Sequence, residues 1–367
     1  MIFFQNSPPR PTQPEPRRIL IIKMSSLGDI IHALPALAAL KTLYPQAAID
    51  WAVEEPLAPL LPGPPYLSEI VLFPKKELRT LAPLRLWRAL KAFRRQLRRA
   101  DYDLSIDLQA LAKSSLVAFL SGARLRLAYW ETREGSFLVS RGVKGPRAAA
   151  HVTERYLDVI RYLGPIPEKL TYPLPDFSLE RAALSQRLLA LGSPEPRALF
   201  FPGASWETKR WPPENYAALG RELVKRGLSL VLGGSGDERD LTQKIIELAP
   251  EVGWVDLAGQ TDLRQLMALT SLARLVVGSD SGPAHVAAAV GAPTISLYGP
   301  NSPDRTGVYG PLAQSLASPA PCAPCFKKVC PRGEWLCLAQ IPVSQVLAAC
   351  RRALGGELAE SLALGQG

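Results

Sequence analysis

The glycine- and serine-rich segment at residues 278–285 (GSDSGPAH) carries side chains suited to holding a phosphate group. It follows a short apolar run at residues 275–277, and its proline suits the first turn of a helix. Because a helix N-terminus presents unpaired N–H groups to an anion, we expect Ser281 and Gly282 to donate to phosphate and Asp280 to hold sugar hydroxyls. A purely structural turn explains the composition as well, since Ser and Asp are favoured N-caps.

Two further segments carry charged residues after predicted strands. In residues 202–212 (PGASWETKRWP), Lys209 could neutralise the charge of a leaving group. In residues 24–32 (MSSLGDIIH), Asp29 could act as a general base. The simpler interpretations are a solvated basic loop and a carboxylate that complements the helix dipole. No G-x-G-x-x-G is present in the N-terminal turn, which argues against a dehydrogenase.

The segment at residues 80–99 predicts a basic amphipathic helix. Its apolar residues recur every three or four positions and predict a stripe that faces the core: Leu81, Leu84, Trp87, Leu90, Phe93 and Leu97. The rest of its surface is largely basic: Arg85, Arg88, Lys91, Arg94, Arg95, Arg98 and Arg99. Such a face binds either an anionic membrane surface or a phosphorylated glycan. We therefore assign a function to the basic face only.

The spacing of the cysteines near the C-terminus, C-x2-C-x4-C-x6-C, suits a structural zinc or iron ion held by Cys322, Cys325, Cys330 and Cys337. Disulfides are the less favoured pairing in a reducing cytoplasm. The spacing departs from the common paired-knuckle pattern, so unligated thiols remain the alternative. A fifth cysteine, Cys350, lies on a predicted helix and is expected in the core.

Alternating strands and helices must position these residues, which predicts an α/β fold with parallel sheets. Strands are predicted at residues 17–23, 48–53, 69–73, 103–107, 197–201, 228–232, 252–256, 275–277 and, as the last strand, 294–298. Helices are predicted at residues 30–43, 80–99, 113–120, 213–226, 237–248, 263–271, 283–290 and 343–354. The proline-rich passage at residues 164–175 separates two such series. The pattern therefore predicts two Rossmann-like domains joined by a linker.

Length and composition agree with a globular enzyme of two domains, because 367 residues exceed one ordinary core. The net charge of +10 favours polyanionic partners. No secretory signal and no membrane-spanning apolar run are recognised, so a cytoplasmic location is expected. The predicted organisation is a disordered leader at 1–17, an N-terminal domain at 18–165, a linker at 166–178, a C-terminal domain at 179–342 with the Cys-rich segment 322–337, and a helix and tail at 343–367.

Four sequence blocks together resemble the ADP-heptose:lipopolysaccharide heptosyltransferases, a family of inverting, metal-independent glycosyltransferases with the GT-B fold. The blocks are IIKMSSLGDIIHALPAL at 21–37, FPGASWETKRWPPENY at 201–216, VLGGSGDERD at 231–240 and LVVGSDSGPAHVAAAVGAPTISLYGPNSPD at 275–304. They occur in order over nearly the whole chain, and the combination of the first with the last is specific. The resemblance implies two Rossmann-like domains whose parallel sheets face a central interdomain cleft, the first binding the acceptor and the second the nucleotide-sugar donor.

The resemblance also implies roles for individual residues. Asp29 matches the catalytic base, and Lys209 matches a lysine that contacts the diphosphate. The implied donor-binding residues are Ser205, Glu238, Thr261, Asp280, Ser281, Gly282 and His285. The implied acceptor-binding residues are Arg85 and Arg88, in the basic cluster after Phe73, and Arg133.

The implied reaction moves L-glycero-D-manno-heptose from ADP-heptose to a phosphorylated, lipid-linked glycan, either Kdo–lipid A or heptosyl-Kdo–lipid A. It requires no catalytic metal, and closure of the domains would assemble the site. The enzyme would work at the inner face of the inner membrane as a peripheral protein.

Other activities remain open from the sequence. The first block favours addition of the first heptose, whereas the second and fourth blocks are closer to enzymes that add the second. Relatives of this fold modify autotransporter proteins or transfer other sugars, and a Cys-rich segment recurs in some of them. A sugar-nucleotide epimerase on the same scaffold would need no acceptor. A basic nucleic-acid-binding protein would form salt-sensitive complexes, but no recognised motif supports it, so no nucleic acid is expected.

Overall fold

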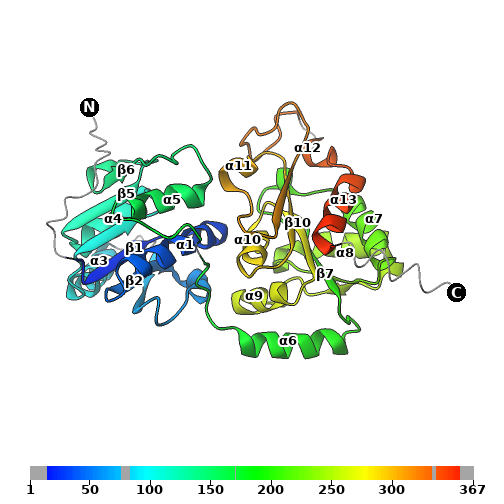
Figure 1. Cartoon of the computed structure of the whole chain (residues 1–367), viewed down its shortest axis with the longest axis horizontal. Helices are drawn as coiled ribbons and strands as arrows, with labels where there is room; N and C mark the ends of the chain where they lie inside the picture. Colours follow the sequence, from blue (N-terminus) through cyan, green and yellow to red (C-terminus); the bar gives the residue numbers. More distant parts are fainter. Residues whose placement is uncertain (1–14, 76–82, 170, 333–335, 356–367) are drawn as a thin grey trace. The chain divides into compact units, whose positions relative to one another are not determined.

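The computed structural model describes residues 15–75, 83–169, 171–332 and 336–355. Most of the predicted leader, the first residues of the predicted basic helix (including Leu81) and the tail beyond residue 355 lie outside these residues. The chain divides into two compact units, Met1–Asp176 and Phe177–Gly367. Each unit is built around its own parallel sheet (Figure 1).

The first unit has a six-stranded sheet in the order β3-β2-β1-β4-β5-β6, and every neighbouring pair is parallel. Residues 19–22 of β1 are at most 1% exposed, as expected for a parallel strand covered on both faces. The strands are β1 Arg18–Ile22, β2 Ala48–Glu54, β3 Glu69–Phe73, β4 Leu104–Asp107, β5 Leu125–Tyr129 and β6 Arg141–Val143. The helices are α1 Leu27–Leu43, α3 Pro83–Arg99, α4 Ala112–Ser121 and α5 Val152–Arg161.

The second unit repeats this plan with the sheet order β12-β11-β10-β7-β8-β9. Its strands are β7 Arg197–Phe201, β8 Ser229–Leu232, β9 Val255–Asp256, β10 Leu275–Ser279, β11 Thr294–Tyr298 and β12 Ala313–Ala317. Its helices are α6 Ser178–Ala190, α7 Pro213–Val224, α8 Arg239–Leu248, α9 Leu263–Ser271, α10 Gly282–Ala289, α11 Pro303–Thr306, α12 Leu336–Ala339 and α13 Val343–Leu354. The prediction that residues 294–298 form the last strand is wrong, because β12 pairs with β11 at the edge of the sheet.

In each sheet the order of strand addition reverses once, because later strands are added on the other side of the first strand. In the first unit β1, β2 and β3 are added on one side and β4 on the other, so the reversal lies between β1 and β4. In the second unit it lies between β7 and β10. Loops at the carboxyl ends of parallel strands diverge at such a point and leave a crevice where ligands bind. We therefore expect ligands to bind at the loops after β1, β4, β7 and β10.

The helix α3 departs from the sequence prediction in its first half. Phe93 and Leu97 are buried, as predicted, and pack with α4 and the sheet. Leu84 and Trp87, predicted to face the core, are 58% and 57% exposed. The reason is that α3 meets the sheet mainly through its second half. Within the described parts of the chain, no helix combines the length and apolarity needed to cross a membrane.

Candidate active site

In the second unit, a buried ion pair occupies the reversal between β7 and β10. The Nζ of Lys209 lies 2.7 Å from the Oδ2 of Asp280, and the two side chains are 12% and 6% exposed. The same ammonium lies 4.6 Å from the centroid of the Trp206 ring. The ion pair between Lys209 and Asp280 thus joins the loop after β7 to the turn that opens α10.

Asp280 has further partners on the neighbouring elements. The Nδ2 of Asn301, in the loop after β11, donates to its Oδ2 at 2.7 Å, and the Nε2 of His285 lies 3.6 Å from its Oδ1. Burial opposes the ionisation of Asp280, but His285 and the Lys209 ammonium outweigh it and lower the pKa of this carboxyl below its usual value. Asp280 therefore provides a fixed negative charge at the start of α10.

The lowered pKa predicts how the Asp280 carboxylate affects stability. Its unfolded pKa is about 3.9, so its stabilising effect is fully present above that pH and is lost as the pH falls through the lower native pKa. We expect Asp280→Asn to unfold at a lower urea concentration than wild type at pH 7. The difference should shrink at pH 3, which lies below the unfolded pKa of about 3.9, so that the carboxyl is already largely protonated in the unfolded chain. A difference that stays constant between these pH values contradicts the assignment.

The N-terminus of α10 offers donors for an anion. Ser281 is the N-cap residue, in extended conformation, and Gly282 begins the helix. Within the described residues, the buried Oγ of Ser281 has no hydrogen-bond partner. A buried hydroxyl without a partner costs free energy, and a bound phosphate oxygen would provide one. The expected donor residues Asp280, Ser281, Gly282 and His285 are thus brought together with Lys209.

Glu238 lies against the backbone of the loop after β7. Its Oε2 accepts a hydrogen bond from the Ser235 N–H at 2.8 Å. A Cβ added to Gly203 would fall 1.9 Å from the carboxyl carbon of Glu238, and one added to Gly234 would fall 2.6 Å from its Oε2. Glycine at 203 therefore allows the loop after β7 to approach Glu238, and glycine at 234 leaves room for the same carboxylate within the loop after β8.

The remaining donor-side candidates lie on these loops. Ser205 is exposed in the loop after β7, and Thr261 is half-buried in the loop after β9. The Gly259 N–H donates to the Gly234 carbonyl at 2.8 Å, which holds the loop of Thr261 beside that of Glu238. The candidates all follow strands of one parallel sheet, so they share its carboxyl edge. Trp206 and Asn301 also lie there and were not singled out from the sequence, although both follow predicted strands.

In the first unit, Asp29 lies in the first turn of α1, after β1. Its Oδ2 accepts hydrogen bonds from the Ser26 N–H at 3.0 Å and the Ser26 hydroxyl at 2.8 Å. Its Oδ1 lies 3.8 Å from the Nζ of Lys23, and its side chain is 40% exposed. The carboxylate is therefore held in place from one side while remaining open to solvent, as a base acting on an external hydroxyl requires.

Lys23 was not singled out from the sequence. Its side chain is 5% exposed, and its Nζ donates to the Leu108 carbonyl at 3.1 Å and to the Tyr156 hydroxyl at 2.8 Å. Burial, with the nearby charge of Asp29, raises the pKa of Tyr156 well above its ordinary value. Lys23 thus places a buried cation 3.8 Å from the Asp29 carboxylate. Its position directly after β1 is the signal in the sequence that could have identified it.

A second carboxylate lies at this edge of the first sheet. Glu54, at the end of β2, accepts hydrogen bonds from Lys75 at 2.5 Å and Lys113 at 2.9 Å. Burial opposes its ionisation, but the two lysines outweigh it and lower the pKa of Glu54. Lys113 also donates to the Ser25 hydroxyl at 2.8 Å, beside the start of α1. Glu54 and Lys113 were not predicted as site residues.

The arginines expected on the acceptor side are exposed. Arg133 is 61% exposed, and its N–H donates to the Ala110 carbonyl in the loop after β4. Arg85 and Arg88 are exposed in the first half of α3. Because α3 connects two parallel strands, it begins on the side of the sheet where β3 ends. The three arginines therefore lie toward the carboxyl edge of the first sheet.

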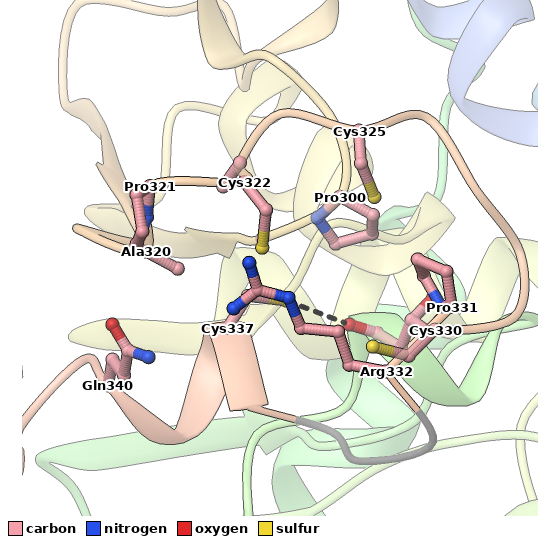
Figure 2. Close-up of a pocket in the computed structure, with 13 residues that line it drawn as sticks. Pro300, Ala320, Pro321, Cys322, Cys325, Cys330, Pro331, Arg332, Cys337 and Gln340 are labelled. Carbon is pink, nitrogen blue, oxygen red and sulfur yellow. Dashed lines mark hydrogen bonds between the residues drawn. The ribbon is translucent and has the colours of Figure 1, made fainter.

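The Cys-rich segment lines a pocket in the second unit (Figure 2), to which Cys322, Cys325, Cys330 and Cys337 all contribute. Over the described residues, no group of three or more His, Cys, Asp or Glu side chains is placed to hold a metal ion. The expected structural zinc or iron ion is therefore not supported. Cys350 is fully buried in the core, as predicted.

The Cys-rich segment contacts the loop that carries Lys209. The Thr208 hydroxyl donates to the Lys328 carbonyl at 3.2 Å, and the Cys337 thiol lies 3.9 Å from the Thr208 carbonyl. The Nζ of Lys328 lies 5.8 Å from the Trp206 ring centroid. The Cys-rich segment therefore packs against the loop that carries Lys209.

Comparison with known proteins is consistent with this arrangement. The family model of glycosyltransferase family 9 (heptosyltransferase) matches residues 90–336. Lipopolysaccharide heptosyltransferase 1 of Pseudomonas aeruginosa is 33% identical, over 85% of this chain and 87% of that protein. The structure of Escherichia coli ADP-heptose lps heptosyltransferase II has a TM-score of 0.73 at 27% identity, over 94% of this chain and 99% of that chain. That of E. coli heptosyltransferase WaaC with ADP has a TM-score of 0.72 at 25% identity, over 92% and 99%.

These similarities confirm the resemblance of the four sequence blocks and the α/β class, with two Rossmann-like domains of the GT-B fold. They also confirm that the protein is a glycosyltransferase. The chain belongs to glycosyltransferase family 9, the heptosyltransferase family.

Proposed function

We propose that this protein transfers L-glycero-D-manno-heptose from ADP-heptose to the inner core of lipopolysaccharide, onto Kdo–lipid A or heptosyl-Kdo–lipid A. The observation that carries the proposal is the start of α10, where the Lys209 ammonium and the unpartnered Ser281 hydroxyl stand at a helix N-terminus. The names of the relatives, an ADP-heptose lps heptosyltransferase among them, support the choice of donor and acceptor.

Asp29 is the general base of the proposed reaction. Its carboxylate takes the proton of an acceptor hydroxyl as that oxygen bonds to the anomeric carbon of the heptose. The bond between this carbon and the β-phosphate oxygen breaks on the opposite face, so the anomeric configuration inverts. The proton then passes from Asp29 to solvent. Its side chain, 40% exposed, and its fixed position, with Oδ1 3.8 Å from the Lys23 ammonium, support this role.

Lys209 and the start of α10 hold the departing ADP. The ammonium neutralises charge that grows on the β-phosphate as the bond breaks, and the Ser281 hydroxyl and the first N–H groups of α10 donate to the same oxygens. Asp280 keeps Lys209 at this position and accepts hydrogen bonds from heptose hydroxyls. In this scheme Lys209 takes the place of a divalent metal, so no catalytic metal is needed.

The other donor contacts come from the neighbouring loops. Glu238 accepts hydrogen bonds from the adenosine ribose, and Ser205, Thr261 and His285 line the nucleotide and heptose. On the acceptor side, Arg85, Arg88 and Arg133 bind phosphates of the inner core. Since that acceptor is lipid-linked, we propose a peripheral enzyme at the cytoplasmic face of the inner membrane.

The proposal is tested by offering the purified protein several donors. ADP-heptose, UDP-glucose and GDP-mannose are each incubated with Kdo–lipid A or heptosyl-Kdo–lipid A in the presence of EDTA. We expect nucleotide release and a heavier acceptor with ADP-heptose only, at a rate that EDTA does not change. Transfer from a UDP or GDP sugar in preference to ADP-heptose contradicts the heptose assignment. Loss of activity with EDTA contradicts the metal-free mechanism.

Replacing Gly203 with Ala is expected to raise the KM for ADP-heptose by about tenfold or more. The new methyl group displaces the Glu238 carboxylate, which removes a hydrogen bond to a charged group worth about 1.5–3 kcal/mol. The matched control is Gly236→Ala on the next loop, where nothing lies within 4 Å of an added Cβ. Donor titrations of both variants, with thermal unfolding to verify folding, check this. An equal KM in the two variants places Glu238 away from the donor.

A further inference from the structure

Two neighbouring helices of the first unit expose large apolar side chains. Leu84 and Trp87 of α3 are 58% and 57% exposed, and Leu116 and Phe119 of α4 are 38% and 57% exposed. Burying such groups is favourable in water, so a soluble surface that displays several together calls for a binding partner. The catalytic scheme uses none of these four residues.

The two helices pack side by side. Both pack on the same core, through Phe93 and Leu97 of α3 and Val117 of α4. At their C-terminal ends the Arg98 Nε donates to the Leu120 carbonyl at 3.2 Å. Both helices connect parallel strands, so they run in the same direction, and their exposed sides face away from the sheet.

The charges carried by these two helices are of one sign. The Nζ of Lys91 lies 4.7 Å from the Trp87 ring centroid, and Arg94 and Arg95 are exposed on the next turn. Neither helix contains an Asp or a Glu. Aromatic and aliphatic side chains on helices whose charged residues are all basic match the boundary between the headgroups and acyl chains of an anionic bilayer.

We propose that this surface, formed by Leu84, Trp87, Leu116 and Phe119 with Lys91 and Arg94 beside them, docks on an anionic phospholipid membrane. We name it the α3–α4 face. Its purpose rests on the proposed function, because a lipid-linked acceptor is presented by a membrane.

Other occupants fit the α3–α4 face less well. A free glycan is bound mainly through hydrogen bonds, and the side chains of Leu84 and Leu116 provide none. A second copy of the same face would bring two sets of basic side chains together, and neither helix carries an acidic residue to pair with them. An anionic lipid surface satisfies both the apolar and the basic side chains.

The test is cosedimentation of the full chain with vesicles that contain neither donor nor acceptor. We expect binding to vesicles of equal amounts of phosphatidylcholine and phosphatidylglycerol, weakened by added salt, and much weaker binding to phosphatidylcholine alone. Each basic residue near an anionic leaflet strengthens binding about fivefold, so Lys91→Gln with Arg94→Gln should weaken it about 25-fold. Trp87→Ser with Phe119→Ser should weaken it by about tenfold or more.

Matched controls lie on the second unit. Leu179 and Leu189 of α6 are 83% and 57% exposed, and the double change of both to Ser should leave vesicle binding unchanged. Lys225→Gln with Lys244→Gln removes two exposed charges and should also have no effect. Thermal unfolding verifies that all variants fold. The proposal is overturned if the wild-type protein stays in the supernatant or if the α3–α4 variants bind vesicles as tightly as these controls. It is also overturned if light scattering shows that the wild-type protein is a dimer and that only the α3–α4 variants are monomers.

Transfer to a deacylated, water-soluble acceptor separates this inference from the proposed function. We expect the Trp87→Ser, Phe119→Ser variant to keep the wild-type rate on that acceptor, because neither residue takes part in the reaction. Transfer without vesicle binding overturns the docking surface alone. Vesicle binding without transfer overturns the proposed function and leaves the docking surface in place.

Discussion

An Asp29→Asn variant is expected to transfer heptose about 100- to 10,000-fold more slowly than wild type, with little change in the KM for ADP-heptose. Asparagine has nearly the shape of aspartate, and its oxygen can still accept the hydrogen bonds from Ser26. It cannot take a proton from the acceptor hydroxyl, so the loss should fall on kcat. Initial rates of ADP release across donor and acceptor concentrations measure it.

A carboxylate in the first turn of another helix provides the matched control for this result. Glu214 lies in the first turn of α7 and is 58% exposed, so Glu214→Gln removes a charge of the same kind at a helix N-terminus. We expect its kcat to equal that of wild type. A folded Asp29→Asn enzyme with near-normal kcat would show that Asp29 only complements the dipole of α1, and the base would have to be sought elsewhere.

A Lys209→Met variant is expected to lose about 100- to 1,000-fold in kcat, because the charge on the departing diphosphate loses its main cation. Methionine preserves most of the length of the side chain but removes the ammonium, and with it the cation–π contact with Trp206. The variant should also melt at a lower temperature than wild type, since the buried Asp280 carboxylate loses its partner at 2.7 Å. Steady-state rates and thermal unfolding measure the two effects separately.

Two comparisons make the Lys209 result specific. Lys209→Arg restores the positive charge and should recover part of the lost kcat. Lys225→Met removes an exposed lysine of the same unit, 69% exposed, and should change neither kcat nor the melting temperature. An unchanged kcat in Lys209→Met would mean that the ammonium serves only to neutralise Asp280.

The central parts of both sheets could be predicted from the sequence because their strands are buried on both faces. β1, β7 and β10 read as short apolar runs, and each leads into a turn with Gly, Ser or Asp. That combination predicts a strand followed by a helix start, which is where the candidate site lies. The strands that were missed lack such runs. β5, β6 and β12 carry polar or half-exposed residues, so no periodic pattern distinguished them from loops.

The members of the site that were missed share a different cause. Lys23, Glu54 and Lys113 are of types that usually lie on the surface, and nothing in their spacing indicates that they meet. Only the parallel pairing of β1 with β2 and β4 brings their loops to one edge of the sheet. The exposure of Trp87 was missed for a related reason, since helical periodicity defines a face but not how much of it a neighbour covers.

The most direct test of the heptose transfer is the mass of the acceptor after incubation with ADP-heptose, EDTA and enzyme. We predict that Kdo–lipid A or heptosyl-Kdo–lipid A gains one heptosyl residue for each ADP released, and that the new linkage has the inverted anomeric configuration by NMR. An acceptor of unchanged mass, or a product that retains the configuration of the donor, would contradict the proposed reaction.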